Sequence, residues 1–175
     1  MRSHNGMRPQ DIPILLKIIS FEQRNFNWKM KDLAKELGIS PSEISESLNR
    51  SYHARLIDDN KRHVFKLAVH EFIVYAIRYV FPQSPGPITR GVRTAHSAPP
   101  INKAIRSDEH YVWPDAEGDT RGQAIEPLYP TLVKASKQDE FLYTALALID
   151  ALRVGRAREK EIARIELEKM IVRRE

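Results

Sequence analysis

The sequence contains no cysteine. Disulfide bonds, thiolate nucleophiles and zinc sites built on thiolates are therefore excluded, because each of them needs the cysteine sulfur. The zinc-finger modes of nucleic-acid recognition are excluded for the same reason. Any binding of nucleic acid by this chain must use another kind of module.

Long apolar runs are also missing. No stretch approaches the roughly 18 consecutive apolar residues that a membrane-spanning helix needs. The first residues, MRSHNGMRPQDIP, lack the apolar centre of a signal peptide. We therefore expect a soluble, cytoplasmic protein that has no membrane partner.

A large excess of one charge is absent as well. The chain has 28 Lys and Arg against 23 Asp and Glu, which gives a formal net charge of +5. Within residues 7–66 there are 11 basic and 8 acidic residues, an excess of three positive charges. A basic surface attracts phosphate polymers, but a balance of this size is equally compatible with solubility alone.

Proline is unevenly distributed and divides the chain into three segments. Residues 7–81 have little proline and show helical spacing of their apolar side chains. Residues 82–130 hold most of the prolines, so we expect an irregular, proline-rich wrap there, without regular helix. Residues 131–175 are again patterned as helix. The sequence thus predicts a mainly α fold, with a helical domain at each end of an irregular segment.

Four helices are predicted in the first segment. The first shows helical apolar spacing over residues 12–19, and the second covers residues 30–37 and ends at Gly38. The third begins after Ser40, whose hydroxyl can accept hydrogen bonds from the free amides of the first turn. The fourth is expected over residues 63–80.

The stretch DLAKELGISPSEISESLNR, from Asp32 to Arg50, has the features of a helix-turn-helix motif. Ala34 is small where the helices cross closely, Gly38 supplies a left-handed turn, and Ile39 with Ile44 fills the angle between the helices. An ordinary helical hairpin with a glycine stop would share the same caps. The stretch resembles the helix-turn-helix of winged bacterial transcription regulators, which include MarR-like and antitoxin-type repressors.

This resemblance covers about residues 9–67 and implies a winged-type helix-turn-helix domain over residues 7–81. The outward side of its third helix would face DNA. Six residues are expected on that side, namely Ser40, Ser42, Ser45, Glu46, Asn49 and Arg50. Asn49 and Arg50 carry donors for base edges or phosphates, and the serines can reach phosphate oxygens. Glu46 stands where many relatives carry a basic residue, so we expect weak binding by one copy.

The resemblance also implies a wing, a short hairpin that contacts the DNA backbone, between Leu56 and Leu67. Lys61 and Arg62 lie at its expected tip and suit phosphate contact, with a solvated loop as the alternative. Because the strand signal is poor there, we expect a short or degenerate wing.

Two further helices are predicted at the carboxyl end, over residues 142–152 and 157–173. We interpret residues 131–175 as an assembly element that forms a homodimer or binds a protein partner; an extra pair of packed helices is the alternative. A homodimer is the default, because two half-sites add the affinity of two weakly charged helices.

Candidate catalytic and metal sites are weak. His63 and His70 are seven residues apart, which is too far to share one metal ion easily. His96 and Ser97 are adjacent, and neighbours in sequence rarely act together as base and nucleophile. We expect no metal, no cofactor and no enzyme activity, although clustered titratable groups around His96 would reopen the enzyme hypothesis.

The sequence therefore predicts a sequence-specific transcriptional regulator that binds double-stranded DNA, with an antitoxin-type repressor as one version of the hypothesis. The alternative is a protein-interaction adaptor that uses the helix-turn-helix as a scaffold without binding nucleic acid. Glu43 and Glu46 favour the adaptor, because they add negative charge to the third helix. Salt-dependent DNA binding distinguishes the two functions.

Overall fold

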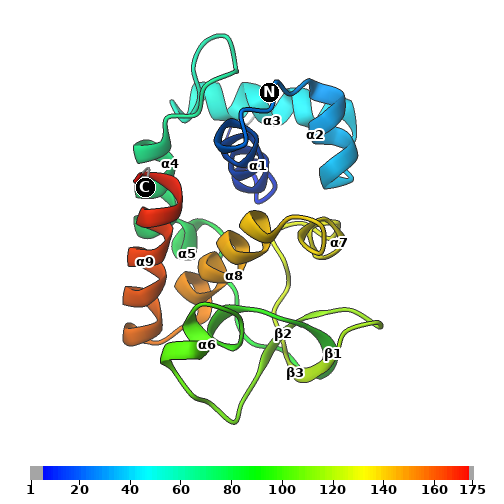
Figure 1. Cartoon of the computed structure of the whole chain (residues 1–175), viewed down its shortest axis with the longest axis vertical. Helices are drawn as coiled ribbons and strands as arrows, with labels where there is room; N and C mark the ends of the chain where they lie inside the picture. Colours follow the sequence, from blue (N-terminus) through cyan, green and yellow to red (C-terminus); the bar gives the residue numbers. More distant parts are fainter. Residues whose placement is uncertain (1–5, 174–175) are drawn as a thin grey trace.

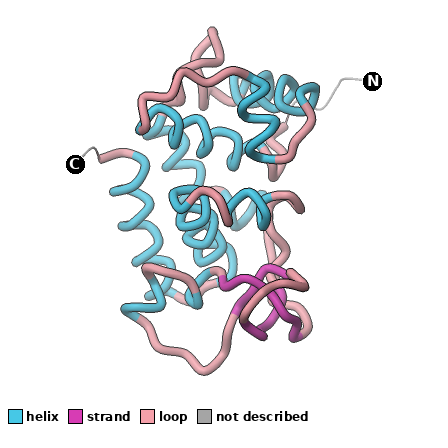
Figure 2. Tube along the Cα trace, turned by 45° about the vertical axis from the view of Figure 1, so that its right-hand side comes forward, coloured by secondary structure: helices cyan, strands magenta, loops and turns pink. Residues whose placement is uncertain are grey.

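The computed structural model describes residues 6–173, and it is mainly helical, as the sequence predicts, but it also contains one small sheet (Figures 1 and 2). The elements follow in this order: α1 (Asp11–Gln23), α2 (Met30–Leu37), α3 (Pro41–His53), α4 (Lys66–Tyr75), α5 (Ile77–Val80), β1 (Ile88–Arg93), η1 (Ala95–Ser97), α6 (Ile101–Ala104), β2 (Tyr111–Pro114), β3 (Thr120–Ala124), α7 (Leu132–Ser136), α8 (Glu140–Val154) and α9 (Ala157–Ile171). In the described part of the chain, no helix is both long and apolar enough to cross a bilayer.

Helix α1 is the centre of the fold. Every residue from Asp11 to Phe21 is buried, because α2, α3, α4 and α8 all pack against this helix. Figure 1 shows α1 between α3 on one side and α8 on the other. A helix that is apolar almost all round is typical of such a central position.

A tight turn joins α2 to α3. Gly38 ends α2 with a φ of 65°, the left-handed conformation that favours glycine. Thr131, from the distant end of the chain, donates a hydrogen bond of 2.7 Å to the carbonyl oxygen of Leu37. Ser40 then caps α3 by accepting a hydrogen bond of 3.3 Å from the amide of Glu43. The predicted end of α2 at Gly38 and the predicted start of α3 after Ser40 are both present in the structure.

The segment after α3 differs from the prediction of one helix over residues 63–80. Ile57 and Val64 form an antiparallel bridge, and Asp58 closes the loop between them by accepting the amides of Arg62 and His63. Because residues 63–65 belong to this loop, α4 begins only at Lys66, and a break at residue 76 separates it from α5.

The prediction of an irregular wrap over residues 82–130 is wrong, because this segment contains a three-stranded sheet. Strand β1 is antiparallel to both β2 and β3, which pair with each other in parallel, so every strand pairs with the other two. Gly91 permits this tight closure: a Cβ there would lie 2.0 Å from the carbonyl oxygen of Trp113. The prolines of the strands are confined to their ends, as Pro87 and Pro114 show.

Helices α8 and α9 confirm the predicted helical pair, but α8 lies in the core and not in a separate element. It packs against α1, α9 and η1, and the buried apolar residues form one cluster through the molecule. Asp150 fixes the sheet to α8, because its carboxylate accepts hydrogen bonds from Trp113 Nε1 at 2.6 Å and Thr94 Oγ1 at 2.7 Å. Arg153 pairs with the same carboxylate.

A buried ion pair joins α1 to the start of α8. Lys17 Nζ lies 2.6 Å from Asp139 Oδ2 and also contacts Glu36 on α2. Asp139 caps α8 by accepting the amide of Leu142, and it accepts a hydrogen bond from Ser20. Burial raises the pKa of Asp139, but these donors and the charge of Lys17 outweigh burial, so its pKa is lowered overall.

We predict that Asp139→Asn lowers the free energy of unfolding at pH 7 by about 1–3 kcal/mol, because a charged hydrogen bond to Lys17 is lost. The folded pKa of Asp139 lies below the unfolded value of about 3.9, so its ionised form stabilises the fold above that pH, and this stabilisation is lost as pH falls through the folded pKa. Urea unfolding at several pH values should therefore show the difference between the two proteins shrinking as the pH falls below about 3.9. A constant difference at every pH would contradict this role.

Candidate nucleic-acid interface

The outward side of α3 is open to solvent. Ser42 and Glu46 are exposed and Ser45 and Asn49 are half-buried, whereas Ile44 and Leu48 face the core. In Figure 1, α3 and the loop after it form one end of the molecule, and the sheet with α6 forms the other. Within the described residues, the other core elements therefore do not cover this side of α3.

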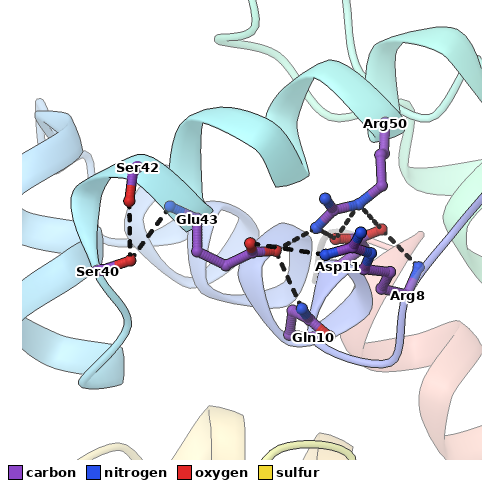
Figure 3. Close-up of polar contacts among 7 residues, drawn as sticks. All are labelled: Arg8, Gln10, Asp11, Ser40, Ser42, Glu43 and Arg50. Atoms are coloured by element: carbon purple, nitrogen blue, oxygen red, sulfur yellow. Dashed lines mark hydrogen bonds and ion pairs between the residues drawn. The ribbon is translucent and has the colours of Figure 1, made fainter. Parts of the chain in front are cut away.

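The start of α3 carries two serine hydroxyls. Ser40 and Ser42 are exposed, and their Oγ atoms lie 3.2 Å apart (Figure 3). Ser40 also accepts the amide of Glu43 as the helix cap. Both hydroxyls keep hydrogen-bonding capacity toward solvent, since a hydroxyl has one donor and two acceptor positions.

Arg50 differs from the expectation that it faces DNA. Its side chain is 7% exposed and makes a two-pronged contact with the buried Asp11 of α1, through Nε to Oδ2 at 2.9 Å and through a terminal nitrogen to Oδ1 at 2.7 Å. The same guanidinium contacts Glu43, which lies seven residues earlier on α3 (Figure 3). The side chain turns inward because Asp11 would otherwise be a buried carboxylate without a cation.

In the same cluster the Glu43 carboxylate is paired, so it does not add a free negative charge to the outward side of α3. Glu43 accepts a hydrogen bond from Gln10 at 3.0 Å and lies 3.9 Å from Arg8, in addition to Arg50 (Figure 3). Partial burial raises the pKa of Glu43, but Arg50, Gln10 and Arg8 outweigh it and lower the pKa overall. The hydrogen bond to Asp11 raises the pKa of Arg50. Glu43 is thus a carboxylate that is paired with cations, which weakens the case that it repels DNA.

The two predicted wing cations have different partners. Lys61 Nζ donates a hydrogen bond to Asn49 Oδ1, which joins the loop to the outward side of α3. Arg62 lies over the ring of Trp28 at 4.0 Å from its centroid and donates to Asn27 Oδ1 at 3.2 Å. Both side chains are half-buried, so Lys61 is held next to α3 and Arg62 is held next to the segment before α2.

Further exposed cations were not expected at this end of the molecule. Lys31 and Lys35 lie one turn apart on α2, and Arg55 follows α3. Within residues 6–173, their side chains take part in no ion pair. The spacing of the two lysines, opposite the buried Leu33 and Leu37, was the signal that could have identified them.

The candidate metal and catalytic residues have separate contacts in the described structure. No group of three or more His, Asp or Glu side chains among the described residues is arranged to hold a metal ion. His63 is exposed and lies 3.8 Å from Glu22, while His70 is buried in α4. Ser97 Oγ accepts the amide of Tyr111, so this hydroxyl serves the local fold.

Comparisons of the chain with known protein families, curated proteins and solved structures found no match. Function is therefore inferred from the residues and their geometry.

We predict that Arg50→Met lowers the free energy of unfolding by about 3–5 kcal/mol, because it leaves Asp11 buried without a cation. Exposed Arg158 is the matched control, and Arg158→Met should change stability by less than about 0.5 kcal/mol. Urea unfolding at neutral pH measures both. The double variant Asp11→Asn with Arg50→Met should recover part of the loss; equal stability of Arg50→Met and the wild type would contradict the structural role.

Proposed function

We propose that this protein is a DNA-binding transcriptional regulator in which α1, α2, α3 and the loop over residues 56–65 form a winged helix-turn-helix with a short wing. The observation that carries the proposal is the open polar side of α3 with Lys61 hydrogen-bonded to it and Arg62 on the same loop. A recognition helix must protrude in this way, because the major groove admits a helix only when its outward side is free.

In the proposed complex, α3 enters the major groove. Asn49 supplies an amide that can bond to a base edge, most favourably to adenine. The start of α3 lies toward a phosphate, because helix amides and the hydroxyls of Ser40 and Ser42 favour an anion there. Lys61 and Arg62 contact the adjacent backbone, and Lys31 with Lys35 adds to the positive field.

The charge balance at this end supports the proposal. Of the acidic residues in the domain, Asp11 and Glu43 pair with Arg50, and Arg8 also lies 3.9 Å from Glu43. Two cations thus match these two carboxylates, whereas the exposed cations of α2 form no ion pair within the described residues. Glu46 is the opposing feature, since it is exposed on the recognition side and is repelled by phosphate.

We predict that the full chain binds duplexes selected from a random pool, with affinity that falls steeply as salt is raised. Lys61→Ala should weaken binding to all sequences and reduce the slope of log affinity against log salt by about one. Asn49→Ala should cost about 1–3 kcal/mol on the selected sequence and relax its specificity. Fluorescence anisotropy of labelled duplexes measures both effects.

Arg121→Ala is the control, because Arg121 is exposed on β3 at the other end of the molecule and should leave binding unchanged. An absence of binding even at low salt would overturn the proposal and favour the adaptor. Equal losses for Arg121→Ala and Lys61→Ala would show nonspecific charge attraction in place of a recognition surface.

We further propose that two copies associate through the exposed side of α4 and α5 that carries Leu67, Tyr75 and Tyr79 together with the charged Glu71 and Arg78. Leu67, Tyr75 and Tyr79 are 61%, 70% and 68% exposed, which is unusual for large apolar side chains that lie near one another in sequence. A second copy is the partner that the DNA proposal requires, because one weakly charged helix binds poorly and two half-sites add affinity.

Sedimentation equilibrium should give a mass near twice the 20.2 kDa of one chain. The double variant Leu67→Ser with Tyr75→Ser should shift the protein toward monomer, because it removes apolar area from the contact. Ile88→Ser is the matched control, since Ile88 is 66% exposed on the sheet. A wild-type monomer, or a dimer that the double variant leaves intact, would contradict this interface.

A further inference from the structure

Glu46 places a negative charge in the middle of the outward side of α3. The residue is exposed, and its side chain makes no hydrogen bond or ion pair within residues 6–173. Ser42 lies four residues before it and Asn49 three residues after it, so the three residues share one side of the helix. Any duplex that α3 enters must therefore meet this carboxylate.

The cations that could pair with Glu46 are engaged elsewhere. On a helix, a glutamate pairs most favourably with a basic residue four positions later. That residue is Arg50, whose guanidinium turns inward and binds Asp11 (Figure 3). The ammonium group of Lys61, on the loop after α3, donates to Asn49 Oδ1. Within the described residues, the fold thus leaves the Glu46 carboxylate available to a donor outside the chain.

The donors of the major groove limit what this carboxylate can contact. An ionised carboxylate only accepts hydrogen bonds, and phosphate oxygens repel it. Guanine presents two acceptors to the groove, and thymine presents an acceptor with a methyl group, so neither base offers a donor. Adenine has an amino group, but its N7 acceptor lies beside that group and opposes the carboxylate. Cytosine N4 is the amino donor that has no acceptor next to it.

We propose that Glu46 determines sequence specificity by accepting a hydrogen bond from N4 of a cytosine in the bound duplex. This inference rests on the proposed function and adds one base pair to the sequence that the protein recognises. Ser42 precedes Glu46 along α3 and the contact between Lys61 and Asn49 follows it, so the proposed backbone contacts lie before and after the carboxylate. A side chain between two backbone contacts faces the base edges. The same carboxylate weakens binding to sequences that place acceptors opposite it.

The test selects duplexes from a random pool with the full-length wild type and with Glu46→Ala, and it identifies the base pair whose preference the variant loses. Fluorescence anisotropy at one salt concentration then measures affinity for four duplexes that differ only at this pair. The wild type should bind the cytosine duplex about fivefold or more tightly than each of the other three. Glu46→Gln should prefer the adenine duplex, because a glutamine amide bonds to both N6 and N7 of adenine.

Glu117→Gln is the matched control, because Glu117 is an exposed carboxylate in the loop between β2 and β3, and it should keep the wild-type preference. If Glu46 only repels phosphate, both of its variants should bind every duplex more tightly and with unchanged preferences. That result overturns this inference and leaves the proposed function in place. A cytosine preference that Glu46→Ala retains overturns the inference in the same way. An absence of binding to any duplex at low salt overturns both.

Discussion

The ion pair between Asp11 and Arg50 sets the position of α3, and the candidate interface depends on it. Asp11 is fully buried at the start of the central helix, so its carboxylate is stable there only with a cation and hydrogen bonds around it. Arg50 supplies both from the far end of α3, while Glu43 binds the same guanidinium nearer the start of that helix. Two points of α3 are thereby held against α1, and the opposite side of the helix is left outward.

The same kind of contact, a buried carboxylate that joins two elements, recurs at two other places in the fold. Asp139 joins the start of α8 to Lys17 of α1, and Asp150 joins the middle of α8 to Trp113 of the sheet. Each carboxylate accepts several hydrogen bonds from different elements, which makes its location specific in a way that apolar contacts alone do not.

The helices and their limits were largely predictable from the sequence, because the determining signals are local. Gly38 and Ser40 lie where they end and begin helices, and the apolar spacing of α8 and α9 is regular. The sheet was not predictable from this proline-rich segment, because its stability comes from pairing between residues far apart along the chain, such as Ile88 and Gln123. The inward turn of Arg50 was missed for a related reason, because its partner Asp11 is 39 residues away.

The most direct test of the central claim is a titration of isotope-labelled protein with a duplex selected from a random pool, followed by backbone amide shifts. If the outward side of α3 binds DNA, the largest shifts fall at Ser42, Ser45, Asn49 and the Lys61 loop, while the amides of β1 to β3 stay unchanged. Shifts confined to the sheet end of the molecule, or no shifts at saturating duplex and low salt, would contradict it.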